Sequence, residues 1–297
     1  MSRRAVLSLA VAGTVLASAC QAPVRPLPTL PPVPTLQVEP TSLPRADGLP
    51  SFDIWAGDDS YQAPDSVPAG RIGVALHVTG DAQRNAQFFK VKDGTSLTQV
   101  ATAFQQNPRS AIDLLDFEGG PGTVPAGDTQ VEVQDLPAGQ YIMATLLLGE
   151  DGQQYVPTGM IKTFEVVAPS SAPAPVAPLP GDQQVILSDF AFGMPELQAG
   201  QQTLRLRNVG SQPHEMLVKR LDGTHDVADA LNFVLRPVGQ PPYSDAGGFL
   251  VFPSGQTTSV SLNLSAGRYV AICYFRDAAS GKTHAELGMI QDFTVGV

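Results

Sequence analysis

The chain has 297 residues, 43% of them hydrophobic and 15% charged, a length and composition that suit about two ordinary globular domains. Its formal net charge is −10 and its pI is about 4.7, so the basic footprint of a nucleic-acid-binding protein is absent and we set that class of partner aside. The 27 prolines and 28 glycines predict many turns and at least one linker.

The first residues have the layout of an export signal. Arg3 and Arg4 form a positive start, and the apolar stretch 5–17 is short for a membrane span. Small residues then lead to Cys20. Residues 2–8 also partly resemble a twin-arginine export signal. These features predict a secretory signal that is removed from the mature chain.

The end of that segment supports a second prediction. The run 16–20, Leu-Ala-Ser-Ala-Cys, resembles the lipobox of bacterial lipoproteins, which implies that residues 1–19 are removed and that Cys20 is acylated as the mature N-terminus. We therefore expect an exported protein, lipid-anchored to the cell membrane or outer membrane and facing the periplasm or the cell exterior. Without its two signal arginines the chain keeps 16 basic and 28 acidic residues, a charge of −12. The alternative is an ordinary signal peptide with an incidental cysteine.

The chain has two cysteines, Cys20 and Cys273. If Cys20 carries lipid, Cys273 has no disulfide partner within the chain in an oxidising compartment. A lone thiol in an exported protein requires burial, metal ligation or a partner chain. By itself Cys273 also fits an inert buried thiol, since free cysteine is among the most buried residue types.

Two proline-rich stretches divide the rest of the chain. Residues 20–47 show neither helical nor strand periodicity, which predicts an extended tether. Residues 168–181 are rich in Pro, Ser and Ala and predict an interdomain linker, which would allow its flanking segments to move independently. Those segments, 48–167 and 182–297, are the two predicted domains.

The two segments are repeats of each other. The same short motifs recur in the same order at a nearly constant spacing: Ala-Gly at 69–70 and 199–200, Asp-Gly-Thr at 93–95 and 222–224, Gly-Gly at 119–120 and 247–248, Tyr at 141 and 269, and Gly-Met-Ile at 159–161 and 288–290. An ordered match of this kind is expected of tandem domains that share one fold.

Within each repeat, runs of four to eight residues alternate apolar and polar side chains between Gly, Pro, Asn and Asp, which predicts β-strands. One short helix is expected in each repeat, capped by Thr95 or Ser96 in the first and by Thr224 in the second. A repeat of about 115 residues matches one antiparallel Greek-key sandwich. The predicted fold class is therefore all-β, with two tandem β-sandwiches.

The second repeat holds the residues with the clearest chemistry. His214 follows a predicted turn, and Tyr-x-x-x-Cys at 269–273 is followed by His-x-x-x-Gly-Met at 284–289. This pattern resembles the cupredoxins, the type 1 blue-copper family. The resemblance implies two tandem cupredoxin-like sandwiches and one type 1 copper, held by His214, Cys273 and His284 with Met289 as a weak axial ligand.

The chemistry of this ligand set supports the same interpretation. Two imidazoles, a thiolate and a distant thioether suit copper that cycles between Cu(I) and Cu(II), because sulfur favours the first and nitrogen the second. Ten residues, 274–283, separate Cys273 from His284, a longer spacing than is common in the family, although copper nitrite reductases also resemble this chain in having a long loop. Asp277, Ser280 and Gly281 predict a hairpin or exposed turn there, which would change solvent access and partner docking.

The first repeat is predicted to lack the site. Alignment of the repeats places Thr145 at the position of Cys273, Tyr155 at that of His284, Asn85 or its neighbour at that of His214, and Met160 at that of Met289. We expect Met160 to be a core methionine. The two remaining histidines are weaker candidates, because His77 is expected to face solvent on a strand and His225 to be structural in the short helix.

These residues favour an electron-transfer protein that exchanges single electrons with a redox partner in the cell envelope. An enzyme is not expected, because four histidines cannot supply a trinuclear centre or a second copper site. Two alternatives stay open: a copper-binding protein for delivery or storage, and a structural or adhesion lipoprotein with a vestigial site. The first repeat would be a structural or docking module.

Overall fold

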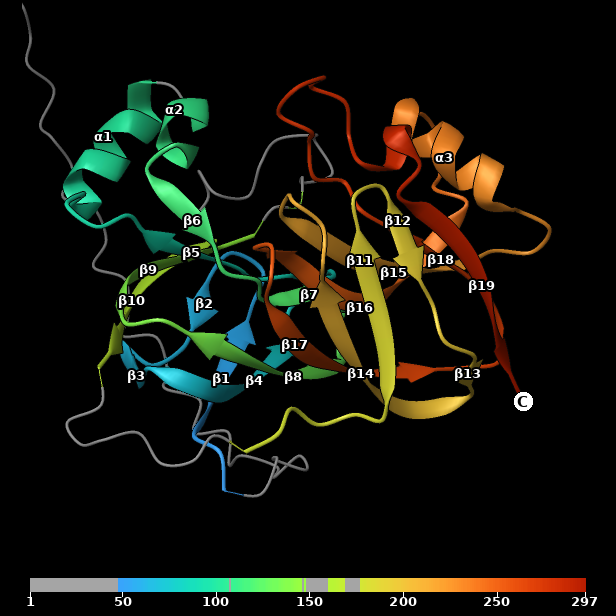
Figure 1. Ribbon diagram of the computed structural model, residues 1–297, viewed down its shortest axis with the longest axis horizontal. Coiled ribbons are helices and arrows are strands. Elements are labelled where there is room, and N and C mark those ends of the chain that lie inside the picture. Colours follow the sequence, from blue (N-terminus) through green and yellow to red (C-terminus); the bar gives the residue numbers. More distant parts are fainter. Residues whose placement is uncertain (1–47, 107, 146, 148–159, 169–176) are drawn as a thin grey trace, which may run out of the picture. The chain divides into compact units, whose positions relative to one another are not determined.

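The computed structural model describes residues 48–106, 108–145, 147, 160–168 and 177–297 (Figure 1). The predicted signal segment, Cys20, the tether, Tyr155 and linker residues 169–176 lie outside the described residues. Residues 43–297 form one compact unit, which contains both repeats.

No helix in the described part of the chain is long and apolar enough to cross a membrane.

The described part of the first repeat consists mainly of short strands. They are β1 (Ser51–Ala56), β2 (Tyr61–Gln62), β3 (Ser66–Pro68), β4 (Gly70–Val78), β5 (Gln87–Val91), β6 (Leu115–Phe117), β7 (Pro121–Thr123), β8 (Thr129–Leu136), β9 (Gly139–Ala144) and β10 (Ile161–Val167), with helices α1 (Leu97–Gln106) and α2 (Pro108–Ile112) between β5 and β6.

The second repeat follows the same order of elements. Its strands are β11 (Gln183–Ser188), β12 (Ala191–Gly193), β13 (Leu197–Gln198), β14 (Gly200–Asn208), β15 (His214–Leu221), β16 (Tyr243–Phe252), β17 (Thr257–Leu264), β18 (Gly267–Ile272) and β19 (Ile290–Gly296), with helix α3 (Val227–Leu235) after β15 and a 3₁₀ turn (Ala285–Leu287) before β19.

The described strands form three sheets. One sheet of eight strands has the order β12-β11-β14-β17-β8-β4-β1-β2 and contains strands of both repeats. A five-stranded sheet, β3-β10-β9-β5-β6, faces it in the first repeat, and a six-stranded sheet, β13-β19-β18-β15-β16-β7, faces it in the second. Each repeat is therefore a two-layer sandwich.

Alternating strands build a separate core inside each sandwich. Strand β1 alternates half-buried and buried residues, as expected of a strand with one face on the core. Ile54 and Leu76 pack in the first core, and Leu204 and Leu206 pack in the second. Met160 is fully buried in the first core, as predicted. The predicted fold class, all-β with two tandem β-sandwiches, is confirmed.

The helices differ from the prediction in two details. The hydroxyl of Ser96 accepts a hydrogen bond from the amide of Gln99, which identifies the predicted cap of α1, but a second short helix, α2, follows it. The cap of α3 is Asp226, not Thr224, because the Asp226 carboxylate accepts bonds from two backbone amides and Asp229 bonds back to the amide of Asp226. This reciprocal capping box is favoured over a lone threonine two residues earlier.

The two sandwiches are joined by strand pairing, a point that the composition of the linker leaves open. Strand β8 of the first repeat pairs with β17 of the second, and β7 pairs with β16. Gln87 and Gln130 are buried and cross the same boundary, Gln87 by bonding both the amide and the carbonyl of Val251. Composition of the linker does not reveal this, because the contacts come from distant strands.

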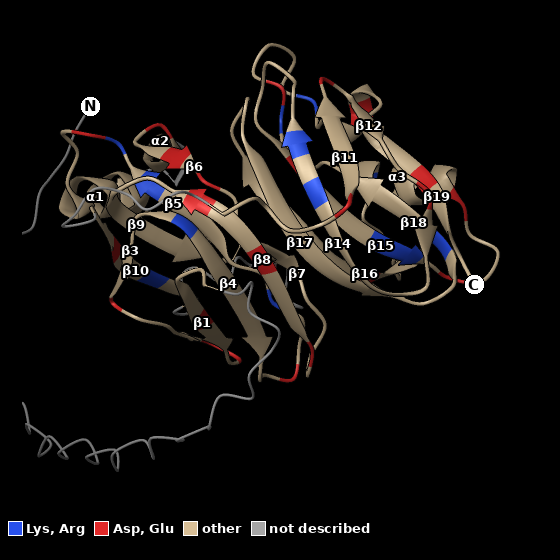
Figure 2. Cartoon of the chain, turned by 60° about the horizontal axis from the view of Figure 1, so that its bottom comes forward, with Lys and Arg blue, Asp and Glu red and all other residues tan. Residues whose placement is uncertain are grey.

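Charged side chains of both signs are distributed over each repeat (Figure 2). Arg205 and Arg207 lie on β14, and Lys219 and Arg220 lie on β15.

Candidate metal site

The predicted ligands lie at one end of the six-stranded sheet. His214 begins β15, Cys273 directly follows β18, and Met289 directly precedes β19. Because β18 pairs with both β15 and β19, with Ile272 opposite Leu217 and Ile290, these strand ends lie side by side. The fold therefore brings together residues that are up to 75 positions apart in the sequence.

His214, Cys273 and His284 form a compact group of metal-binding atoms. Their ligand atoms all lie within 4.8 Å of one another, and the three residues are fully buried. The two Nδ1 atoms are 3.0 Å apart, and Sγ of Cys273 is 3.5 Å from Nδ1 of His284. Within the described residues this is the one group of three or more His, Cys, Asp or Glu side chains positioned to share a metal ion.

Met289 lies beside this group. Its side chain is fully buried and packs in the same core cluster as Cys273. Its amide donates to the carbonyl of His284 at 2.8 Å, and its carbonyl accepts from the amide of Cys273 at 3.1 Å. These backbone bonds fix the relative positions of three of the four predicted ligands.

Burial determines the protonation of the donor atoms. Desolvation lowers the pKa of His214, and desolvation followed by the charge of the other imidazole lowers the pKa of His284 to about 4, so both rings are neutral near pH 7. Burial, with the nearby Glu215 carboxylate, raises the pKa of the Cys273 thiol. A neutral imidazole is ready to bind a metal, whereas the thiol gives up its proton when the metal binds.

Asp189 orients the first imidazole and was not identified from the sequence. Its Oδ1 lies 3.1 Å from Nε2 of His214, while Ser211 donates its hydroxyl at 2.7 Å and its amide at 3.0 Å to the same carboxylate. The bonds from Ser211 lower the pKa of Asp189 to about 2, so it is ionised. A carboxylate at Nε2 places the proton there and leaves the lone pair on Nδ1, which faces the group.

Phe190, the next residue, covers the second imidazole. Its ring meets the His284 ring edge-on, with centroids 5.2 Å apart and an interplanar angle of 77°. Its φ of 66° is the one positive φ of a non-glycine among the described residues. A strained backbone is retained where the surroundings determine it. The turn between β11 and β12 thus supplies both Asp189 and Phe190 to the site.

The backbone and side chain of Glu215 surround the thiol. Its amide points at Sγ of Cys273 at 3.5 Å, and its side-chain Oε1 accepts from the amide of Tyr274 at 2.7 Å. Burial raises the pKa of Glu215 to about 7. An amide directed at a ligating sulfur is one of the outer contacts that tune a metal site.

The ten residues between Cys273 and His284 form a hairpin, as predicted. Asp277 bonds backbone to backbone with Lys282 and Gly281, and its carboxylate accepts from the amide of Ser280 at 2.7 Å. Gly281 has a φ of 71°, a conformation that favours glycine. The amide of His284 donates to the carbonyl of Phe275 at 2.7 Å. The hairpin therefore returns His284 to Cys273 despite its length.

The corresponding end of the first sandwich is occupied by a different group. Thr145 takes the place of Cys273, because its amide bonds the carbonyl of Met160 as Cys273 bonds Met289. Arg84, the neighbour of Asn85, takes the place of His214, because Arg84 is bridged to Val124. In the second repeat His214 pairs with Phe252 in the same way. The first repeat has no ligand set at these positions.

Arg84 fills its end of the first sandwich with hydrogen bonds. Its guanidinium is 2% exposed and donates to the carbonyls of Gly57, Asp58 and Gln83 at 2.7–2.9 Å. Asp58 also lies 3.5 Å from the guanidinium through its carboxylate, as Asp189 lies beside His214. Arg84 and Asp58 of the first repeat thus occupy the positions that His214 and Asp189 have in the second.

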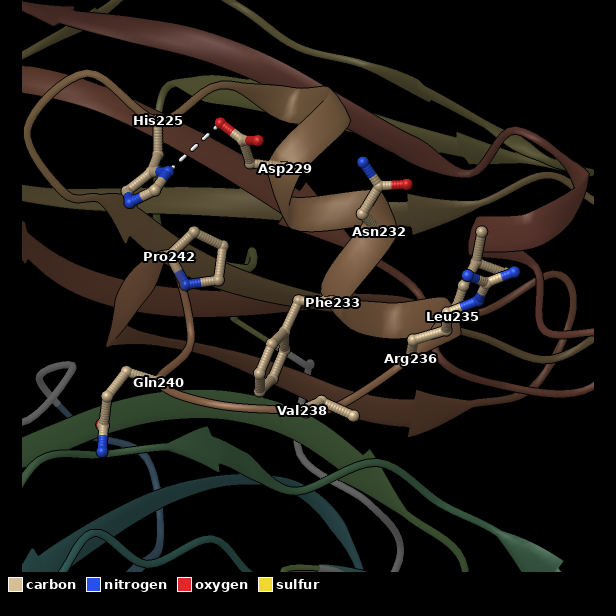
Figure 3. Close-up of a pocket in the computed structure, with 9 residues that line it drawn as sticks. All are labelled: His225, Asp229, Asn232, Phe233, Leu235, Arg236, Val238, Gln240 and Pro242. Atoms are coloured by element: carbon tan, nitrogen blue, oxygen red, sulfur yellow. Dashed lines mark hydrogen bonds and ion pairs between the residues drawn. The ribbon is translucent and has the colours of Figure 1, made fainter.

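The two other histidines lie outside the group. His225 is half-exposed, pairs with Asp229 at 3.2 Å and lines a shallow hollow beside α3 with Phe233 (Figure 3). His77 is stacked on Trp55 with ring centroids 4.0 Å apart and bonds Asp53, so its side chain is mostly buried instead of solvent-facing. The stacking partner comes from the neighbouring strand, which the alternation of His77 along its own strand does not show.

The donor set is consistent with a type 1 copper site. A first-row ion binds nitrogen and sulfur at about 2.0–2.3 Å, so three trigonal donors lie roughly 3.5–4 Å apart. Here the two Nδ1 atoms are 3.0 Å apart, Sγ is 3.5 Å from Nδ1 of His284, and all three donors lie within 4.8 Å of one another. Two imidazoles, one thiolate and a distant thioether are the set of blue-copper sites, whereas structural zinc takes four Cys or His ligands. Nε2 of His284 is buried without a hydrogen-bond partner among the described residues, as suits a ring held by its other nitrogen.

Comparisons with known proteins give weak likenesses only. No family model and no curated protein matches the sequence. Among solved structures, auracyanin B is 21% identical over 41% of this chain and 94% of its own, with a TM-score of 0.28. The auracyanin of Roseiflexus castenholzii is 18% identical over 40% of this chain and all of its own, with the same TM-score. A multicopper oxidase is 14% identical over 83% of this chain and 88% of its own, with a TM-score of 0.26.

Because these TM-scores are below 0.5, the likenesses add nothing to what the strand register and side chains of this chain show.

Proposed function

We propose that the C-terminal repeat holds one type 1 copper ion and exchanges single electrons with a redox protein of the cell envelope. The observation that carries this proposal is the convergence of two imidazole nitrogens and one thiol in a buried group, with Met289 beside them. Copper in such a set supplies a reversible one-electron change. His214, Cys273 and His284 would hold it, with Met289 as the weak fourth ligand.

The surrounding residues support electron transfer by keeping the ligands in place. The ligand residues are attached to paired strands, and Asp189 and Phe190 fix the two rings. Burial of all three donors excludes water from the group. A site that moves little between two oxidation states needs little reorganisation, which favours fast electron exchange.

The same burial argues against copper delivery as the main role. A delivery site exchanges its metal with a partner, which requires ligands that the partner can reach. His214, Cys273 and His284 are fully buried. A purely structural sandwich is also disfavoured, because the first repeat builds the same fold with a fully hydrogen-bonded Arg84 where the second has metal-type donors.

We propose further that the protein is not an enzyme and that it is exported and anchored through Cys20. His77 and His225 have other partners, which leaves two histidines for a single metal site. The anchor is tested by the mass of the mature chain and by its release from membranes in a Cys20→Ser variant. A mature chain that begins before Cys20, or that carries no lipid, contradicts the anchor.

The copper site is tested by the visible and electron-spin-resonance spectra after addition of Cu(II), for the wild type and a Cys273→Ser variant. An intense orange-red absorption that vanishes in the variant establishes a thiolate–copper bond. A colourless protein with no bound copper refutes the site. A reversible potential with fast self-exchange then supports electron transfer, and slow exchange of electrons with ready exchange of metal supports delivery or storage.

A further inference from the structure

The hairpin between Cys273 and His284 contacts the first repeat through one aromatic ring. Phe275 meets the His284 imidazole edge-on, with centroids 5.5 Å apart at 74°. Its ring also meets Phe117 of β6 edge-on, with centroids 5.4 Å apart at 85°. Phe117 in turn contacts Phe89 of β5 at 5.1 Å. A continuous series of ring contacts therefore runs from a predicted copper ligand into the first sandwich.

The position of Phe117 is fixed relative to the second repeat. It pairs with Phe89 on the neighbouring strand β5. Two residues further along the chain, the amide of Gly119 donates to the carbonyl of Val251 at 2.8 Å. The intervening Glu118 accepts from the side chain of Gln256 at 3.4 Å. Phe117 is thus attached to both repeats, whereas Phe275 belongs to a hairpin whose residues 278–282 are exposed.

The two phenylalanine rings that contact His284 come from different parts of the chain. Phe190 covers one edge and comes from the second repeat itself, whereas Phe275 has the first repeat behind it. Edge-to-face aromatic pairs are favourable at these centroid distances, so each ring restrains the next. Without Phe117, Phe275 would lose the ring contact on the side away from the ligand.

We propose that the first repeat forms the outer wall of the metal site, with Phe117 as a positioning residue that holds Phe275 against His284. The part of this inference that concerns copper rests on the proposed function. The wall itself is a property of the protein with or without metal. The first repeat would then restrict access to the group of His214, Cys273 and His284 and fix the orientation of the His284 ring.

The test compares four variants of the full chain, each carrying Cys20→Ser so that Cys273 is the one cysteine. They are Phe117→Ala, Phe275→Ala, the double variant, and Phe104→Ala as a matched control. Phe104 packs in the same core cluster as Phe117 but on α1, so its loss loosens that cluster without removing the ring that contacts Phe275.

Two rates are measured. The first is the reaction of the Cys273 thiol with a disulfide reagent in metal-free protein, and the second is the removal of Cu(I) from loaded protein by bathocuproine disulfonate. We expect Phe117→Ala to raise both rates by about three- to tenfold, the factor that corresponds to the loss of one edge-to-face pair. Phe104→Ala should leave both rates within about twofold of the wild type. The double variant should react at the same rates as Phe275→Ala alone.

The outcomes separate this inference from the proposed function. A faster thiol reaction in Phe117→Ala, together with failure to bind copper in all proteins, supports the wall and refutes the copper site. Unchanged rates in Phe117→Ala, or equal increases in Phe104→Ala, overturn the wall even when the wild type binds copper. The wall is also overturned if both rates are three- to tenfold higher in the double variant than in Phe275→Ala, because Phe117 would then not act through Phe275.

Discussion

Replacing Asp189 by asparagine removes the negative charge beside His214 while keeping the size of the side chain. The carboxylate accepts from Nε2 of His214 at 3.1 Å and is itself held by Ser211 and the amide of Gln212. Outer contacts of this kind are worth about 10- to 100-fold in metal affinity. The Asp189 side chain is 35% exposed, so solvent screens its charge. We therefore expect the loss of Cu(I) affinity to be at the lower end of this range, about tenfold or 1.4 kcal/mol.

The affinity for Cu(I) is measured by competition with a chelator of known affinity, and the visible spectrum reports whether the ligand set survives. Asp58→Asn is the matched control, because Asp58 stands beside Arg84 as Asp189 stands beside His214. We expect Asp189→Asn to weaken binding with the absorption band retained, and Asp58→Asn to leave binding unchanged. Equal affinities for Asp189→Asn and the wild type, or equal losses in both variants, would refute the orienting role.

Three further predictions concern the stability of the fold. Gln87→Leu leaves the buried amide of Val251 without its acceptor and should lower the free energy of unfolding by about 2–4 kcal/mol in urea denaturation, with little effect for the exposed Gln140→Leu. Burial keeps the pKa of Glu132 well above its usual range, so its carboxyl ionises more readily in the unfolded state. The wild type should therefore lose stability relative to Glu132→Gln as pH rises above about 5, and a constant difference between the two would contradict this. Phe190→Gly should be about 1 kcal/mol more stable than Phe190→Ala in thermal melts, because glycine relieves the positive φ, and equal stabilities would mean that no strain is stored there.

The buried group of His214, Cys273 and His284, with Met289 beside it, could be predicted from the sequence because most of its pattern is local. Cys273 and Met289 lie on or beside one segment, and their spacing is retained whatever the rest of the chain does. The hairpin that returns His284 could also be predicted, since Asp277 and Gly281 are residues that turns require. The resemblance to cupredoxins added His214, which follows a predicted turn far upstream.

The supporting residues could not be predicted, because each reaches the site across the sandwich. Asp189 lies 25 positions before His214 and in a turn without glycine or proline, so nothing in the sequence singles it out. The repeat alignment gave Asn85 or its neighbour as the counterpart of His214, and strand register identifies Arg84. The register of a strand is set by its pairing with neighbouring strands. An alignment of short motifs predicts that register only to within one residue.

The joining of the two sandwiches was left open by the sequence for a related reason. Gln87 and Gln130 are polar residues within alternating strands, which favours a solvent-facing interpretation, yet both are buried against the other repeat. The repeated Gly-Gly pairs were visible as a motif but not as an interface. A Cβ at Gly119 would collide with the ring of Phe249, and one at Gly122 would collide with the backbone of Gly248. Such close backbone approach requires glycine and is evident only from the fold.

The last prediction compares Arg84 of the first repeat with His214, which occupies the corresponding position in the second repeat. Arg84→Leu leaves three carbonyls without the guanidinium that bonds them and should lower the free energy of unfolding by about 2–4 kcal/mol. In metal-free protein His214→Leu should cost about 1 kcal/mol, because Asp189 keeps its bonds from Ser211 and Gln212 and is partly exposed.

With Cu(I) present the order should change, because the wild type gains the free energy of metal binding and His214→Leu does not. The measurement is urea denaturation of both variants with and without metal. If His214→Leu costs as much as Arg84→Leu in the absence of copper, the imidazole is a structural element like the arginine. If it costs little without copper and much with it, the fold tolerates this buried histidine and the metal accounts for its contribution to stability.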